Sequence, residues 1–496
     1  MINESITVHD QHQFEIKLGY RLHKESTVTA YGLDAYLYLP YSLGVNRATY
    51  SKTQFYNDIQ AYIRLKSPEL PLGRIVSGAG APAASLKTAV EALAAGATGE
   101  SAAASEAEIM IFGCIVKSAL RDYVAFLRQA QIEGDRRRLA DQYLQYASEI
   151  LAAYRNLRPV LQIPTVSERQ FGVYLFGDEY LSLLFEDYSY LMLETVLTED
   201  DTSFKDLRRR LILFIDSELA YRKQHNYPSI PDEKSDNEQL LFRKSVLKKY
   251  IGRVLFLTTR SEPEGALIEQ VLFGIAAGIA MLFATAVAFY TQSIFGSLTL
   301  PFFVALVVSY VFKDRLKDFL RLYLSKRLTS RFFDHHMRIH TSDRKKVGSC
   351  RESFEFVEEP RVPVEVRQMR RRDHITEIEN GWMGEKVILY RKRIRLRTRL
   401  IRQTFMQHEI EGINDIMRFS VLEFIRKMDN PKKQLYVLDA EDYQRVKGDR
   451  VYHLNLILKY MLPSRLVYKR FRIVLNRKQI KRIEPVTVRE VPLQST

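Results

Sequence analysis

The sequence predicts an α+β membrane protein with a mainly helical N-terminal domain, a two-helix transmembrane hairpin and a basic C-terminal β-rich domain. Residues 270–312 contain no Asp, Glu, Lys or Arg over 43 positions. Apolar residues follow a helical spacing before this run and mostly alternate after it. Residues 313–496 contain 43 Lys and Arg against 24 Asp and Glu, a net +19, whereas the whole chain carries +15. The basic excess therefore lies entirely after the apolar run.

The composition is that of a globular chain. Of the 496 residues, 46% are hydrophobic and 27% are charged, which excludes wholesale disorder and a collagen-like chain. This length predicts two or three domains. Two cysteines, Cys114 and Cys350, exclude a disulfide scaffold and agree with a reducing compartment.

Three segments are expected before the apolar run. Residues 1–75 show period-two alternation, as at Phe14, Ile16 and Leu18, and predict a small α/β segment. Residues 76–105 are rich in Ala, Gly and Ser and predict a flexible loop, partly helical around residues 86–95. Residues 106–263 predict a helical bundle, with helices at 106–131, 135–156, 167–197, 204–225 and 237–258.

The apolar run is too long for one membrane span and about right for two, since one span needs about 20 residues. Thr291, Gln292 and Ser293 mark a break, so residues 264–312 predict a hairpin with helices at about 266–290 and 298–312. Both flanks are cationic, which favours a two-pass plasma (inner) membrane protein with both termini cytoplasmic. The alternative is a hairpin buried in a large soluble core.

Small residues recur on the first predicted span. Gly274 and Gly278 form a G-x-x-x-G pair, and Ala280 and Ala284 belong to a stripe at four-residue spacing. Small side chains let helix backbones approach closely in lipid. We expect these four residues to serve helix packing, either between copies of the protein or within the hairpin.

Residues 313–343 predict a basic amphipathic helix beside the membrane. Apolar residues alternate there with six cations that we expect to contact anionic lipid or a partner: Lys313, Arg315, Lys317, Arg321, Lys326 and Arg327. The alternative is a bundle helix with a solvated basic face.

Residues 344–496 predict a basic, β-rich cytoplasmic domain. Alternation places Arg393, Arg395, Arg397 and Arg399 on one face of a strand. Four arginines on one face repel each other, so the face needs solvent, neighbouring acids or an anionic partner. Phospholipid headgroups or an acidic protein surface would serve; nucleic acid is the less expected partner, since few aromatic residues lie between the cations.

No pattern in the sequence carries catalytic chemistry. His335, His336 and His340 form the densest histidine cluster, but a zinc site needs three or four ligands, and only Asp334 or His374 could complete one. Glu179, Glu186, Asp187 and Glu194 stand at heptad spacing without the histidine of a di-metal bundle. We expect these acids to be solvated or to pair with cations such as Arg208–Arg210. The sequence thus predicts no catalytic, cofactor or metal site, and an enzyme is the less favoured class.

These features favour a membrane-anchored adaptor or assembly protein with two cytoplasmic interaction domains. Its partners would be the phospholipid membrane and either another protein or further copies of the chain. Two other classes stay open: an oligomeric transport or channel subunit, and a membrane-bound enzyme without a recognisable motif.

Overall fold

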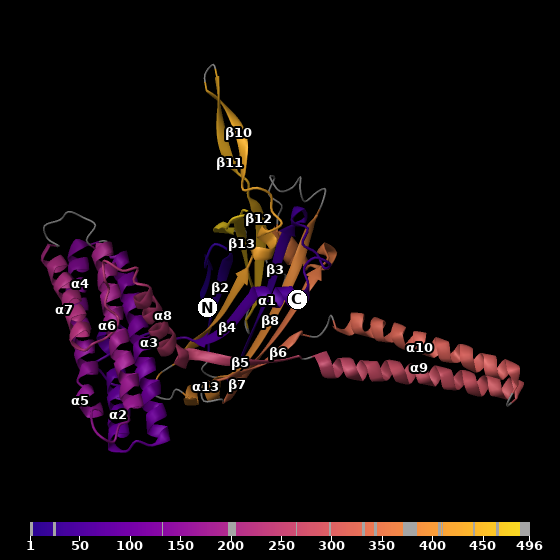
Figure 1. Cartoon of the computed structure of the whole chain (residues 1–496), viewed down its shortest axis with the longest axis horizontal. Coiled ribbons are helices and arrows are strands. Elements are labelled where there is room, and N and C mark those ends of the chain that lie inside the picture. Colours follow the sequence, from indigo (N-terminus) through magenta and orange to yellow (C-terminus); the bar gives the residue numbers. More distant parts are fainter. Residues whose placement is uncertain are drawn as a thin grey trace.

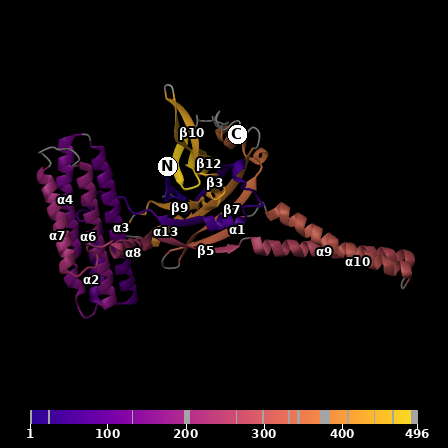
Figure 2. The same cartoon turned by 45° about the horizontal axis from the view of Figure 1, so that its top comes forward.

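The computed structural model spans the chain and describes residues 3–22, 26–130, 132–196, 205–263, 265–296, 299–329, 333–341, 345–370, 384–404, 408, 410–439, 442–462 and 466–486. A large sheet stands at the centre, with a helical bundle on one side and a pair of long helices extending away from the opposite side (Figure 1). A narrow two-stranded ribbon leaves the sheet in a third direction. The second view keeps the bundle and the helix pair on opposite sides of the sheet (Figure 2).

Within the residues that the structure describes, the central sheet has twelve antiparallel strands and is nearly closed into a barrel. In spatial order the strands are β1 (Asn3–Val8), β2 (Gln13–Arg21), β9 (Gly412–Ser420), β4 (Ile59–Leu65), β5 (Phe256–Pro263), β6 (His335–His340), β7 (Lys346–Val357), β8 (Glu385–Arg397), β3 (Val28–Pro40), β12 (Tyr452–Met461), β13 (Leu466–Leu475) and β14 (Ile480–Val486). The two end strands, β1 and β14, come into contact. Lys469 of β13 reaches across this seam to Glu4 of β1 at 3.0 Å.

Strands from both ends of the chain interleave in this sheet, so the predicted division into a helical N-terminal and a β-rich C-terminal domain is wrong. β2 pairs with β9, with Phe14 opposite Phe419. β3 lies between β8 and β12, with Tyr38 opposite Val387 on one side and Asn455 on the other. Alternation along a strand predicts the strand and its buried face, but it carries no information about which distant strand is the partner.

The sheet encloses an apolar core, and one stretch of it is covered on its outer side as well. Phe14, Ile16 and Leu18 alternate with half-buried positions and are buried. β3 is buried at almost every position, because a short helix, α11 (Val364–Arg370), packs its Val366 and Met369 near Tyr36 and Tyr38. Further short helices are α1 (Lys52–Asp58), α13 (Thr398–Thr404) and α14 (Leu422–Ile425).

The helical bundle contains α2 (Pro82–Ala95), α3 (Gly99–Gln129), α4 (Glu133–Arg155), α5 (Arg158–Leu161), α6 (Glu168–Val196), α7 (Lys205–Gln224) and α8 (Glu238–Gly252). The Ala-rich segment predicted as a flexible loop is mostly helical. Alanine has the highest helix propensity, and Leu86, Val90 and Leu93 recur at helical spacing and are buried. Thr98 and Ser101 form a capping box at the start of α3.

The predicted two-helix transmembrane hairpin is wrong, although two long helices occupy this region. α9 (Gly265–Phe295) and α10 (Leu300–Thr329) pack antiparallel along their length. Among the described residues, one helical segment is long and apolar enough to cross a membrane, Gln270–Phe295. α10 is not a second one, because the helix continues without a break beyond Phe312 into Lys313, Asp314 and Arg315. About 13 apolar residues give α10 about 20 Å of apolar length, short of the roughly 30 Å hydrocarbon core.

A separate two-stranded ribbon projects from the sheet. It consists of β10 (Lys432–Asp439) and β11 (Asp442–Asp449), and every position of β10 is exposed. Leu435, Tyr436 and Leu438 are among its exposed apolar residues. The ribbon therefore contributes surface rather than core.

Candidate functional site

The pair α9–α10, called the arm from here on, is held together by small residues. Ala276 and Ala280 of α9 are 0% and 1% exposed, and Ser309 of α10 is 5% exposed. Ala284 is half-buried on the same side of α9. Gly274 and Gly278 do not take part, since a Cβ atom on either would meet no heavy atom within 4 Å. The predicted packing residues thus separate into an alanine face inside the arm and a glycine face outside it.

The outer surface of the arm is apolar over most of its length. Its large exposed hydrophobic side chains are Val271, Ile275, Ile279, Met281, Leu282, Phe283, Phe289, Tyr290, Ile294, Phe295, Leu300, Phe303, Val304, Leu306, Val307, Val308, Tyr310, Val311, Phe312, Phe319, Leu322 and Tyr323. Leu282 and Leu300 are 74% and 76% exposed. Contiguous apolar surface on this scale marks a site of contact with another protein or a membrane.

Cations begin on α10 where its apolar stretch ends. The ammonium nitrogen of Lys313 lies 3.8 Å from the centre of the Tyr310 ring. The guanidinium carbon of Arg321 lies 3.8 Å from the centre of the Phe273 ring on α9. Arg315 and Lys317 are exposed, as are Asp314 just before them and Asp318 just after them. Lys326 and Arg327 fall within α10, but their side chains lie outside the described residues.

Asp334, which follows α10 in the chain, binds the base of the arm to the sheet. Its carboxylate accepts hydrogen bonds from Lys52 at 2.5 Å, Tyr56 at 2.9 Å and the backbone N–H of Phe354 at 2.7 Å. The backbone N–H of Asp334 donates to the carbonyl oxygen of Glu352 at 2.7 Å. Burial, followed by the Asp334 charge, raises the pKa of Tyr56 well above its ordinary value. Tyr56 therefore stays a neutral donor, and the base of the arm is fixed to the sheet.

Three of the four arginines predicted to share one strand face lie on that face. Arg393, Arg395 and Arg397 point outward from β8, whereas Arg399 lies in α13 beyond the strand. Arg393 pairs with Asp34 at 2.7 Å and donates to the carbonyl oxygen of Leu33. Arg395 and Arg397 are exposed and form no ion pair with any described residue. These two are the members available to an anionic partner.

The histidine cluster lies on strand β6, not on a helix. His336 and His340 share a face of the strand, but they are four residue steps apart, which is about 13 Å along a strand. His335 points to the other face and packs edge-on against Tyr56 at 4.3 Å. No group of three metal-ligating side chains occurs among the described residues, and His374 lies outside them. The strand geometry thus keeps the three imidazoles from a common ion.

Three of the four acids on α6 pair with cations, although Asp187 stays exposed, and Glu194 is exposed as well. Glu179 binds Arg243 at 2.6 Å, and Asp187 binds Lys244 at 2.7 Å. Glu186 pairs with the fully buried Arg222. The partners come from α7 and α8, but they differ from the Arg208–Arg210 group that the spacing suggested. Arg210 instead binds Asp141 of α4 at 2.5 Å.

The sheet interior contains a buried ionic group that no motif in the sequence predicts. The ammonium of Lys392 on β8 lies 2.7 Å from Asp415 on β9 and 3.3 Å from Glu352 on β7. Burial alone would lower the pKa of Lys392, but the two carboxylates outweigh it and raise the pKa. Burial, and then Glu352, raises the pKa of Asp415. Lys392 stands between outward-facing arginines, so only the inward register of residue 392 could have indicated this site.

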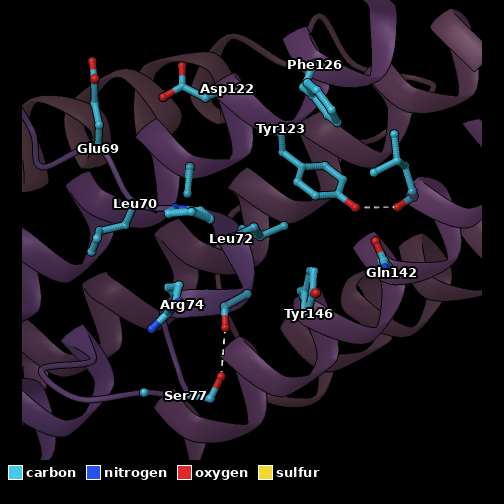
Figure 3. A pocket seen from close by; sticks show the side chains of 15 residues that line it. Glu69, Leu70, Leu72, Arg74, Ser77, Asp122, Tyr123, Phe126, Gln142 and Tyr146 are labelled. Carbon is cyan, nitrogen blue, oxygen red and sulfur yellow. Dashed lines mark hydrogen bonds between the residues drawn. The ribbon is translucent and has the colours of Figure 1, made fainter. Parts of the chain in front are cut away.

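A cavity of about 850 Å³ lies where residues 69–78 cross α3 and α4. Figure 3 shows Leu70, Leu72, Tyr123 and Tyr146 around it. Tyr123 donates to the carbonyl oxygen of Leu139 at 2.7 Å, and Ser77 donates to that of Gly73 at 2.9 Å. The two acids among its lining residues already have partners, since Glu69 binds Lys66 and Asp122 binds Arg121. The cavity offers an apolar and aromatic wall suited to binding.

Comparison of the chain with protein-family models, curated proteins and solved structures finds no match.

Proposed function

We propose that the protein is a membrane-anchored adaptor or assembly protein, attached through its arm, with the sheet and bundle as its interaction domains. The observation that carries this proposal is the exposed apolar end of the arm, which ends in cations on α10. Apolar surface stabilises insertion into hydrocarbon, and cations at its boundary attract anionic headgroups.

The proposed mode of attachment follows from the unequal helices of the arm. The part of the arm in which neither helix carries a charge extends from the tip of the arm to the level of Phe312. This part is about 20 Å long, measured along α10. This part enters the hydrocarbon from one side, and Lys313, Arg315 and Lys317 lie at the headgroups. The cationic boundary favours the cytoplasmic face of the plasma (inner) membrane for the sheet and bundle.

The adaptor part of the proposal is supported by binding surfaces away from the arm. Arg395 and Arg397, which pair with no acid in the described part of the chain, offer their charges to an acidic protein partner. The cavity of Figure 3 offers an apolar wall on the bundle. Gly274 and Gly278 lie on the outside of the arm, where a second copy could approach closely.

A carbonate wash of the membrane fraction tests the attachment. The wild type is expected to stay in the pellet, and the variant Phe303→Asp/Val307→Asp is expected to be released, because each Asp costs about 2.5–3.5 kcal/mol in the hydrocarbon. The matched control Ile212→Asp/Leu213→Asp changes two exposed apolar residues of α7 and should stay in the pellet. Release of the wild type would refute the proposal.

A further inference from the structure

The helical bundle contains a lysine, Lys117, in a partly buried position away from the arm. This residue of α3 is half-buried and stands among buried neighbours on the helix face that meets α6 and α8. It lines a groove of about 430 Å³ together with the cations Lys244 and Lys248 of α8. Lysines are rarely buried unless they are paired.

The cations in this groove outnumber the anions that face them. Lys244 is compensated by Asp187 at 2.7 Å. Lys117 and Lys248 form no ion pair with any described residue. Burial and then the charges of Lys248, Arg64 and Arg121 lower the pKa of Lys117 to about 8, while Cys114 acts in the opposite direction. Arg121 is itself paired with Asp122 at 2.8 Å.

The positive charge extends to the adjoining face of the sheet. Burial and then Arg121 and Arg64 lower the pKa of Lys17 on β2. These cations belong to residues 1–312, whose net charge is −4. The overall charge of this part of the chain therefore gives no indication of them. Unpaired cations held together against their repulsion are typical of a site that receives an anion.

The rest of the groove is apolar. Tyr180, Tyr188, Leu183, Leu184, Leu191 and Leu241 line it beside Ser245. Leu241 is 62% exposed at its mouth. A ligand that fits both parts carries an anionic group at one end and an apolar chain at the other.

We propose that the groove between α3, α6 and α8 binds a single-chain amphiphile with a phosphate head, which Lys117, Lys248 and Ser245 hold while its chain lies along Leu183, Leu184 and Leu241. This site is independent of the arm and of the attachment proposed above. Phosphate is an acceptor that ammonium and hydroxyl donors bind as a charge-assisted hydrogen-bond partner.

Equilibrium binding of radiolabelled dodecyl phosphate to the full chain in a non-ionic detergent tests the proposal. Saturable binding is expected, with at least tenfold weaker binding in Lys117→Gln and in Lys248→Gln. Leu241→Ser should also weaken it. Lys249→Gln, an exposed cation on the same helix, is the matched control and should bind as the wild type does.

Competition distinguishes the amphiphile from a free anion. Inorganic phosphate is expected to displace dodecyl phosphate only at concentrations at least tenfold above those of the unlabelled amphiphile. Equal potency of the two competitors would overturn the proposal, since the apolar wall would then contribute nothing. Unchanged affinity in both Lys117→Gln and Lys248→Gln would overturn it as well.

Discussion

The guanidinium carbon of Arg321 on α10 lies 3.8 Å from the centre of the Phe273 ring on α9. This contact joins the charged half of α10 to the apolar helix beside it, and it lies on the sheet side of the charge-free tip. Cation–π contacts of this kind contribute about 0.5–1 kcal/mol at exposed sites. The arm is therefore one body with an apolar end and a cationic base, and the distinction between the two ends is the basis of the proposed attachment.

The cations on α10 should strengthen binding to anionic membranes. The variant Lys313→Gln/Arg315→Gln/Lys317→Gln/Arg321→Gln is expected to lose affinity for anionic vesicles, since each cation near the surface contributes about 1 kcal/mol. Sedimentation with vesicles containing phosphatidylserine measures this loss. A matched control replaces four exposed cations of α7, Lys205, Arg208, Arg209 and Lys223, and should leave the affinity nearly unchanged. Equal losses in the two variants would show that net charge alone governs binding.

The buried ionic group of the sheet should be sensitive to loss of its cation. Lys392→Met leaves Asp415 and Glu352 buried without their partner. Removing one member of a buried pair costs about 3–5 kcal/mol, so chemical denaturation should report a free energy of unfolding lower by that amount. Arg395→Met, an outward-facing cation of the same strand, is the control and should change it by less than about 1 kcal/mol. Equal effects of the two changes would contradict the burial of Lys392.

The stability of the bundle should depend on pH through Lys117. The folded-state pKa, about 8, lies below the ordinary 10.5, so below pH 8 the folded protein bears the full cost of the charge. Between these values the unfolded chain binds more protons, and the cost disappears as the pH rises. Lys117→Met should therefore raise the free energy of unfolding at pH 7 by on the order of 1 kcal/mol, since solvent screens part of the repulsion.

Thermal unfolding of Lys117→Met and the wild type from pH 7 to 10.5 measures this dependence. The difference between the two proteins should shrink steadily over that interval, and Lys249→Met should show no such trend. A difference that stays constant with pH would mean that packing, and not the charge of Lys117, causes it.

The close approach of three bundle helices at Gly177 should forbid a side chain there. A Cβ atom on Gly177 would collide with the Tyr154 hydroxyl and lie 2.8 Å from Ile109 Cγ2. Gly177→Ala is expected to destabilise the protein by about 1–3 kcal/mol, against the gain of about 1 kcal/mol from helix propensity. Gly172→Ala on the same helix meets nothing within 4 Å and should be neutral or stabilising in the same thermal unfolding measurement.

Local elements could be predicted from the sequence where the pattern was periodic. The helix expected at 135–156 is α4, Glu133–Arg155, and the alternation around Arg393 and Arg395 gives the inward and outward faces of β8. The pairing of β2 with β9 could not be predicted, because the partners Phe14 and Phe419 lie far apart in the sequence and no local pattern links them. The same limit hid the group around Lys392, whose carboxylates come from two other strands.

The arm shows why the absence of charged residues over 43 positions was not enough to predict two membrane spans. The apolar run holds enough residues for two spans, but its division into α9 and α10 is unequal, and α10 continues into charged residues without a break. The spacing of the histidines was also misleading. His336 and His340 would be neighbours on a helix, but they lie far apart on a strand. In the arm the expected helices form, but the charged residues of α10 leave its apolar stretch too short to span a membrane. For the histidines the secondary structure itself differs from the expected helix.

The insertion depth of the arm tests the central claim most directly. Single cysteines at Phe303, Val307, Phe319 and Leu322 can carry a nitroxide label, because the native Cys114 and Cys350 are buried and burial raises the pKa of Cys114 to about 11. In lipid vesicles, labels at 303 and 307 should be accessible to oxygen and shielded from a water-soluble relaxation agent, and labels at 319 and 322 should lie at the headgroups or in water. Water-accessible labels at 303 and 307 would contradict the account.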